Sequence, residues 1–239
     1  ANKLRRLMSD AEVELLLINT RHNVRYLTGG YHYHFHANSQ RMGRSRYIPI
    51  IGIPRRIEEA FYVHRKEESW QMDPDCPWMQ NRVEAIRGTL TTAERTVETI
   101  KAAGLESARI AVELPFLPAD FYLALREGLP GADIVDGTAI LEELRTIKSE
   151  EEIRHIRSVY DRVAEAIQDA FARSNAGDST KKIEGKVQLA MAERGVNFLF
   201  ALIAAGPSFV RAPREDITWD QGRILHIDAG GEVGDYIGD

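Results

Sequence analysis

Residues 225–239 read LHIDAGGEVGDYIGD, and this stretch decides the fold that the sequence predicts for the second half of the chain. The pattern of residues 225–229 is typical of a buried strand. Residues 230–235 are rich in glycine and acidic turn formers, and a returning strand begins at Tyr236. The pattern therefore predicts an antiparallel hairpin.

Two of the aspartates in this hairpin, Asp228 and Asp239, lie eleven positions apart. If residues 232–235 form a four-residue loop, Asp228 lies opposite Asp239, with the Cβ atoms about 4.5–5.5 Å apart. A register slip of two residues keeps both carboxylates on one face, whereas a slip of one residue separates them. Carboxylates that close repel each other and lose solvation, so one is protonated or a cation lies between them. The residues alone leave two interpretations open: a divalent cation site, or ordinary Asp and Gly turn residues.

The Asp-x-Gly hairpin followed by a second Asp resembles the pita-bread metallopeptidase and creatinase family. This family includes prolidase, Xaa-Pro aminopeptidase, methionine aminopeptidase and creatinase. The resemblance implies that Asp228 and Asp239 are the first two ligands of a two-metal centre. It also implies two divalent metal ions as cofactors, and oxygen-rich ligation favours Mn, Co or Fe, or Zn in a mixed site.

Two further stretches carry the resemblance. Residues 143–154 (ELRTIKSEEEIR) are similar to the start of the family's catalytic domain, and residues 23–30 (NVRYLTGG) resemble the N-x-x-Y-L-T-G of the amino-terminal domain in prolidases and creatinases. The implied fold is α/β: a creatinase-like mixed-sheet domain at residues 1–145, followed by the first half of a pita-bread catalytic domain at 146–239.

The chain also departs from the family. A His, two Glu ligands and a further catalytic His follow the second Asp in metal-dependent members, so we expect a chain truncated after Asp239 and assign no catalytic residue. The peptidases also carry a substrate-binding His before the first ligand, but residues 204–213 (AAGPSFVRAP) contain none. Arg211 or a neighbour stands in its place. A guanidinium pairs well with a carboxylate but does not shuttle protons, so we assign Arg211 to substrate binding.

Apolar periodicity supports an α/β organisation. Short apolar or β-branched runs predict strands at 14–18, 47–51, 60–63, 109–112 and 133–135. Helical patterns precede, separate and follow these strands, at residues 2–9, 92–103, 118–127 and 138–144. Strands that alternate with helices are typical of an α/β domain.

The pattern changes after Lys148. Ser149 and Glu152 form a capping-box pattern, which predicts the start of a long helix. Its expected apolar face consists of Ile153, Ile156, Tyr160, Val163, Ile167 and Phe171. A second helix is expected at about 180–194, and strands are expected at about 199–204 and 223–229.

Three histidines alternate with other residues at positions 32, 34 and 36. On a strand, His32, His34 and His36 would share one face, as in a zinc site. A second interpretation is a polar loop or pocket wall. The family resemblance implies a third, in which these histidines and nearby arginines approach the pocket of a dimer mate and bind an anionic substrate end.

Composition narrows the class of protein. The 239 residues are 44% hydrophobic and 28% charged, as in a globular protein. The net charge of −5 disfavours nucleic acid as a partner. We find no apolar run long enough for a membrane span and no signal core, so we expect a cytoplasmic protein without a membrane partner. One cysteine excludes an internal disulfide and a cysteine-based zinc knuckle.

Three hypotheses for function follow. The first is metal-dependent hydrolysis of a peptide bond next to proline, as in Xaa-Pro aminopeptidase or prolidase, with a small peptide as substrate and a homodimer as the expected assembly. The second is a creatinase-like reaction on a small non-peptide molecule, which the missing histidine and the His-rich loop favour. The third is a catalytically silent fragment or binding module, because two carboxylates alone rarely hold a catalytic ion tightly.

Overall fold

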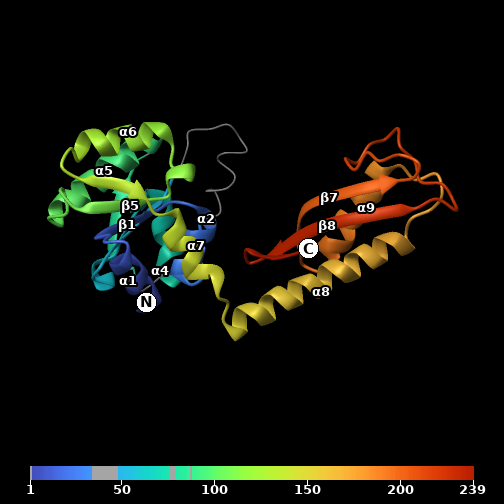
Figure 1. The fold of residues 1–239 in the computed structure, drawn as a ribbon, viewed down its shortest axis with the longest axis horizontal. Helices are drawn as coiled ribbons and strands as arrows, with labels where there is room; N and C mark the ends of the chain where they lie inside the picture. Colours follow the sequence, from blue (N-terminus) through green and yellow to red (C-terminus); the bar gives the residue numbers. More distant parts are fainter. Residues whose placement is uncertain (1, 34–47, 76–78, 87) are drawn as a thin grey trace. The chain divides into compact units, whose positions relative to one another are not determined.

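The structure is a computed structural model that describes residues 2–33, 48–75, 79–86 and 88–239. The chain forms two compact units, Ala1–Ile147 and Lys148–Asp239 (Figure 1). Both units combine helices with a β-sheet, so the predicted α/β class is confirmed. Among the helices of these ranges, none is both long and apolar enough to cross a membrane.

The first unit is built on a mixed six-stranded sheet with the strand order β4-β3-β2-β1-β5-β6. Its strands are β1 (Leu15–Ile18), β2 (Ile50–Pro54), β3 (Phe61–Arg65), β4 (Asn81–Ala85), β5 (Arg109–Val112) and β6 (Asp133–Asp136). Strand β2 pairs antiparallel with both β1 and β3, and the other neighbours pair in parallel.

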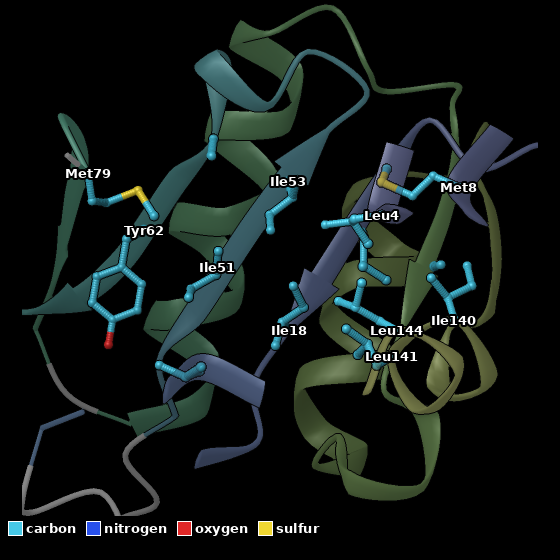
Figure 2. Packing of buried hydrophobic residues seen from close by; sticks show 14 of the residues in the cluster. Leu4, Met8, Ile18, Ile51, Ile53, Tyr62, Met79, Ile140, Leu141 and Leu144 are labelled. Carbon is cyan, nitrogen blue, oxygen red and sulfur yellow. The ribbon is translucent and has the colours of Figure 1, made fainter. Parts of the chain in front are cut away.

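Helices cover both faces of this sheet. They are α1 (Asn2–Asp10), α2 (Arg21–Thr28), α4 (Ser69–Asp75), α5 (Gly88–Ala102), α6 (Ala119–Gly128) and α7 (Thr138–Thr146). Because successive strand residues point to opposite faces, the apolar run of β1 serves two cores. Leu16 and Ile18 pack with α1, α2 and α7, whereas Leu15 and Leu17 pack with α5 and α6. Figure 2 shows the first of these cores, where Leu4 and Met8 of α1 pack with Ile18 and with side chains of α7.

The NVRYLTGG stretch forms α2, for which no helix was predicted. Asn23 Nδ2 donates to Glu113 Oε1 at 2.6 Å, and the N–H groups of Asn19 and Thr20 donate to Glu113 Oε2. The buried Glu113 carboxylate thus binds the start of α2. The helix ends at Gly29, whose φ of 76° is the left-handed conformation that favours glycine. The stretch therefore has a structural role in this unit.

A buried polar cluster lies on the α1/α7 side of the sheet. The Glu68 carboxyl is 0% exposed, and it accepts hydrogen bonds from the hydroxyls of Tyr31 at 2.7 Å and Tyr62 at 3.1 Å. The Arg65 N–H donates to its second oxygen at 3.1 Å. Burial raises the pKa of Glu68 to about 8, although the Tyr31 and Arg65 hydrogen bonds act in the opposite direction. Glu68 therefore holds its proton at neutral pH.

The second unit packs two helices on one face of an antiparallel sheet. Its elements are α8 (Glu150–Ala172), α9 (Thr180–Glu193), β7 (Asn197–Ala205), β8 (Leu225–Val233) and β9 (Tyr236–Gly238), in the strand order β7-β8-β9. The capping box at the start of α8 is confirmed, since Ser149 N donates to Glu152 Oε2 at 2.7 Å and Glu152 N donates to Ser149 Oγ at 3.2 Å. One sheet face packs on the helices through Ala201, Ile203 and Ala229.

The predicted apolar face of α8 is partly wrong. The fully buried positions of α8 are Val159, Val163, Ala166 and Ala170, whereas Ile153, Tyr160 and Phe171 are exposed. Strand β9 approaches the helix backbone so closely that a Cβ at Gly238 would lie 2.7 Å from Tyr160 N. Small side chains are therefore favoured at this contact, and the Tyr160 ring lies outside it.

Candidate metal and substrate site

The terminal hairpin forms as predicted, but its loop is shorter. Val233 pairs with Tyr236, so the turn consists of Gly234 and Asp235 alone. Both residues have positive φ, 60° and 66°, as a type I′ turn requires. The turn expected at 230–235 is therefore too long, and the assumed four-residue loop at 232–235 does not form, because β8 continues through 230–233.

This register determines how the two aspartates face each other. Gly231 pairs with Gly238, so continuing the register by one residue places Asp239 opposite Gly230. Asp228 is two positions before Gly230, so Asp228 and Asp239 are diagonal neighbours on the same face. Diagonal neighbours lie about 7–8 Å apart, farther than the directly opposed pair. The observed register thus differs by two residues from the directly opposed one, and both carboxylates stay on the same face.

The glycines of β8 mark close packing and not a turn. Phe200 of β7 pairs with Gly230, and a Cβ at Gly230 would lie 2.5 Å from Phe200 Cε1. The Phe200 ring therefore lies over Gly230, on the face that carries Asp228 and Asp239, where it is 36% exposed. Glycine in a strand often allows such a close approach.

Arg211 provides a cation for Asp228. The guanidinium Nη2 donates to Asp228 Oδ2 in a short ion pair, with the side chains 46% and 35% exposed. Asp228 pairs with Leu202 of β7, and Arg211 lies beside β7, where its carbonyl accepts from Ile203 N at 2.7 Å. The guanidinium thus reaches Asp228 from the edge of the sheet. The cation near the carboxylate in this structure is an arginine.

The segment that carries Arg211 is fixed at both ends. At its start, Ser208 N donates to the carbonyl of Ala205 at the end of β7. Beyond Arg211, the N–H of Arg214 donates to Thr180 Oγ1 at 2.9 Å, and Thr180 N donates to Ile217 O at 2.8 Å. These bonds attach residues 206–217 to β7 and to the start of α9, which positions Arg211.

The same sheet face carries other polar groups. His226 lies two residues before Asp228 on β8, shares its face and is exposed. Glu232 pairs with Ile237 of β9, which is 56% exposed. The face therefore combines carboxylates, an imidazole, a guanidinium and exposed apolar side chains.

The donor set suits a divalent cation only in part. Two carboxylates are the hard oxygen ligands that Mn²⁺ and related ions accept. Within the described ranges, however, no group of three or more His, Cys, Asp or Glu side chains is arranged to hold a metal ion. Asp228 and Asp239 would therefore supply part of a coordination shell, with the other donors coming from elsewhere.

The predicted histidine set falls mostly outside the described residues. His34 and His36 lie there, as do Arg41, Arg44 and Arg46. His32 is described and belongs to no helix or strand, and its carbonyl accepts a hydrogen bond from Gln71 Nε2 at 3.0 Å. Its assignment to substrate binding stays a prediction.

Known proteins are similar to both units of the chain. The Creatinase/Prolidase N-terminal domain family matches residues 1–147. No curated protein sequence matches the chain. Among solved structures, the Xaa-Pro dipeptidase from Bacillus anthracis has a TM-score of 0.79 at 18% identity, and the match covers 100% of this chain and 62% of that one.

Two other solved structures are also similar. The prolidase from Pyrococcus horikoshii OT3 has a TM-score of 0.73 at 20% identity, over 99% of this chain and 61% of that one. The X-Pro aminopeptidase from Thermotoga maritima MSB8 has a TM-score of 0.71 at 17% identity, over 100% and 62%. The chain thus spans about 62% of the length of such proteins, and it has the fold of their amino-terminal domain followed by part of the catalytic domain.

Proposed function

This chain belongs to the creatinase/prolidase family, and on that premise we propose that it acts in the metal-dependent hydrolysis of a peptide bond next to proline. The observation that carries the proposal is the shared face of Asp228 and Asp239 on the β8–β9 hairpin. The fold that presents this face is similar to that of a protein described as an Xaa-Pro dipeptidase.

The residues of this face would have different roles. Asp228 and Asp239 would supply carboxylate oxygens to two divalent ions, which when bound lower the pKa of a water and polarise the scissile carbonyl. Arg211 would bind a carboxylate of the substrate, because a guanidinium forms strong charge-assisted bonds with carboxylates. Phe200 offers an exposed apolar ring on the same face, next to both aspartates.

The test is a panel of Xaa-Pro dipeptides with added Mn²⁺, applied to the protein purified from its natural source and to recombinant D228N and D239N variants. We expect each substitution to reduce hydrolysis by at least about 10–100-fold, the loss that follows even from changes to the groups around metal ligands. D216N is a matched control, since the exposed Asp216 pairs with Arg214 and lies outside the β8–β9 hairpin. Lack of cleavage of every dipeptide, or full activity in D228N, would contradict the proposal.

A second candidate function is a creatinase-like reaction on a small non-peptide substrate. The position of Arg211 favours it, because the peptidases of the family have a histidine in this segment and a permanently charged guanidinium cannot replace its proton chemistry. A small substrate with a carboxylate would suit Arg211. The test is to supply small amidino or amide compounds that carry a carboxylate. Turnover of one of them, together with no cleavage of any Xaa-Pro dipeptide, would favour this function over the first.

We also propose that the protein forms a homodimer, as the family resemblance implies, and that it acts in the cytoplasm. Light scattering coupled to size-exclusion chromatography measures the assembly directly. A monomer at micromolar concentration would contradict the dimer.

A further inference from the structure

The ion pair between Arg211 and Asp228 occupies a carboxylate oxygen that the proposed function assigns to a metal ion. Arg211 Nη2 bonds directly to Asp228 Oδ2. Among the described residues, no Lys or Arg pairs with Asp239, so the two carboxylates differ in their surroundings. Of these two carboxylates, Asp228 is therefore already neutralised by an internal cation, whereas Asp239 is not.

The position of Arg211 is set by the backbone and not only by the ion pair. The bond from Ile203 N to Arg211 O holds the residue beside β7, and the Arg214 bonds to Thr180 hold the segment that follows. These contacts remain if the guanidinium leaves Asp228, since none of them involves the Arg211 side chain. The long side chain, 46% exposed, can therefore move while its backbone stays in place.

We infer that Arg211 and a divalent metal ion compete for Asp228, so that metal binding must displace the guanidinium. The inference rests on the proposed function for the metal, but it concerns the arginine. A guanidinium bonded to Asp228 would stand within a few ångströms of a bound divalent ion, and two cations so close repel each other. Arg211 thus lowers the affinity of the hairpin for metal and keeps Asp228 neutralised in its absence.

The size of the effect follows from the exposure of the pair. Exposed ion pairs contribute little, and removing such a competitor is expected to raise metal affinity by roughly 1.5- to 5-fold. The pair is also screened by salt, so the difference should shrink as the ionic strength rises.

The first experiment is calorimetric titration of Mn²⁺ into the whole chain and its R211Q variant. We expect R211Q to bind Mn²⁺ about 1.5- to 5-fold more tightly than the wild type at low salt. R214Q is the matched control, because Arg214 is three residues away and pairs with Asp216 instead. Its Mn²⁺ affinity should equal that of the wild type.

The second experiment needs no variant of Arg211. The side-chain ¹⁵N resonance of Arg211 is followed by NMR while Zn²⁺, a diamagnetic ion, is added to the wild type. We expect saturating Zn²⁺ to move this resonance to the position that it has in D228N, where the ion pair is absent.

Different results would overturn the competition alone or the metal site as well. Equal Mn²⁺ affinity in the wild type and R211Q, or an Arg211 resonance that Zn²⁺ leaves unchanged although the ion binds, would overturn the competition and leave the metal site intact. No binding of either ion to any variant would overturn both the competition and the metal ligands of the proposed function.

Discussion

Replacement of Glu68 by glutamine is expected to stabilise the first unit at neutral pH. The Glu68 carboxyl is completely buried beside the hydroxyls of Tyr31 and Tyr62, and burial raises its pKa to about 8 from 4.5. Glutamine has nearly the same shape and cannot ionise, and a tyrosine hydroxyl both donates and accepts hydrogen bonds. The variant therefore keeps the packing and removes the titration.

Proton linkage sets how the stability changes with pH. The folded state binds the Glu68 proton more tightly than the unfolded chain, so this contribution to stability is complete below about pH 4.5 and declines as the pH rises through 8. Since one pKa unit corresponds to about 1.4 kcal/mol, the full loss is about 5 kcal/mol above pH 8, and about 3 kcal/mol of it is already lost at pH 7. E68Q should not lose this stability.

The assay is urea unfolding of the whole chain between pH 5 and pH 8, with amide hydrogen exchange at Val63 of β3 as a probe of the first unit. We expect the free energy of unfolding to fall over this range in the wild type and to stay nearly constant in E68Q. E127Q, at an exposed position of α6, controls for a general effect of replacing a glutamate by glutamine. Equal pH dependence in the wild type and E68Q, or a less stable E68Q at pH 7, would refute the reasoning.

Three further substitutions test other contacts. D178N removes the charge of a buried carboxylate that two lysines of α9 neutralise, and urea unfolding should show a loss of about 1–3 kcal/mol. The hydrogen bonds from these lysines hold the pKa of Asp178 well below its usual range. The contribution of Asp178 to stability should therefore be complete above about pH 4 and disappear in acid. E113Q leaves donors at the start of α2 unpaired and should lower stability by about 1–3 kcal/mol, with faster hydrogen exchange in α2 than in α8. G238A pushes a Cβ against the backbone of Tyr160 and should lower the free energy of unfolding by about 1–3 kcal/mol. A thermal unfolding temperature equal to that of the wild type would show instead that β9 can move away.

Local patterns predicted many of the elements. The capping box at Ser149 starts α8, and the apolar runs around residues 15–18 and 109–112 form β1 and β5. These signals are short-range, because a cap or an apolar run stabilises its own element wherever it packs.

Elements that depend on distant partners were missed. Strand β4 has a mostly polar sequence and forms by pairing with β3, and the start of α2 is bound by Glu113, ninety positions after Asn23.

The alternation of side chains along a strand is enough to predict that Asp228 and Asp239 share a face of the hairpin in every even register, and that an odd register would separate them. Which register forms, and which groups surround the two aspartates, is seen only in the folded structure. The turn at Gly234 and Asp235 selected the diagonal register, and the contact of Phe200 with Gly230 explains why β8 continues past its glycines. The ion pair of Arg211 with Asp228 depends on a segment held between β7 and α9, a long-range arrangement that no local pattern in the chain encodes.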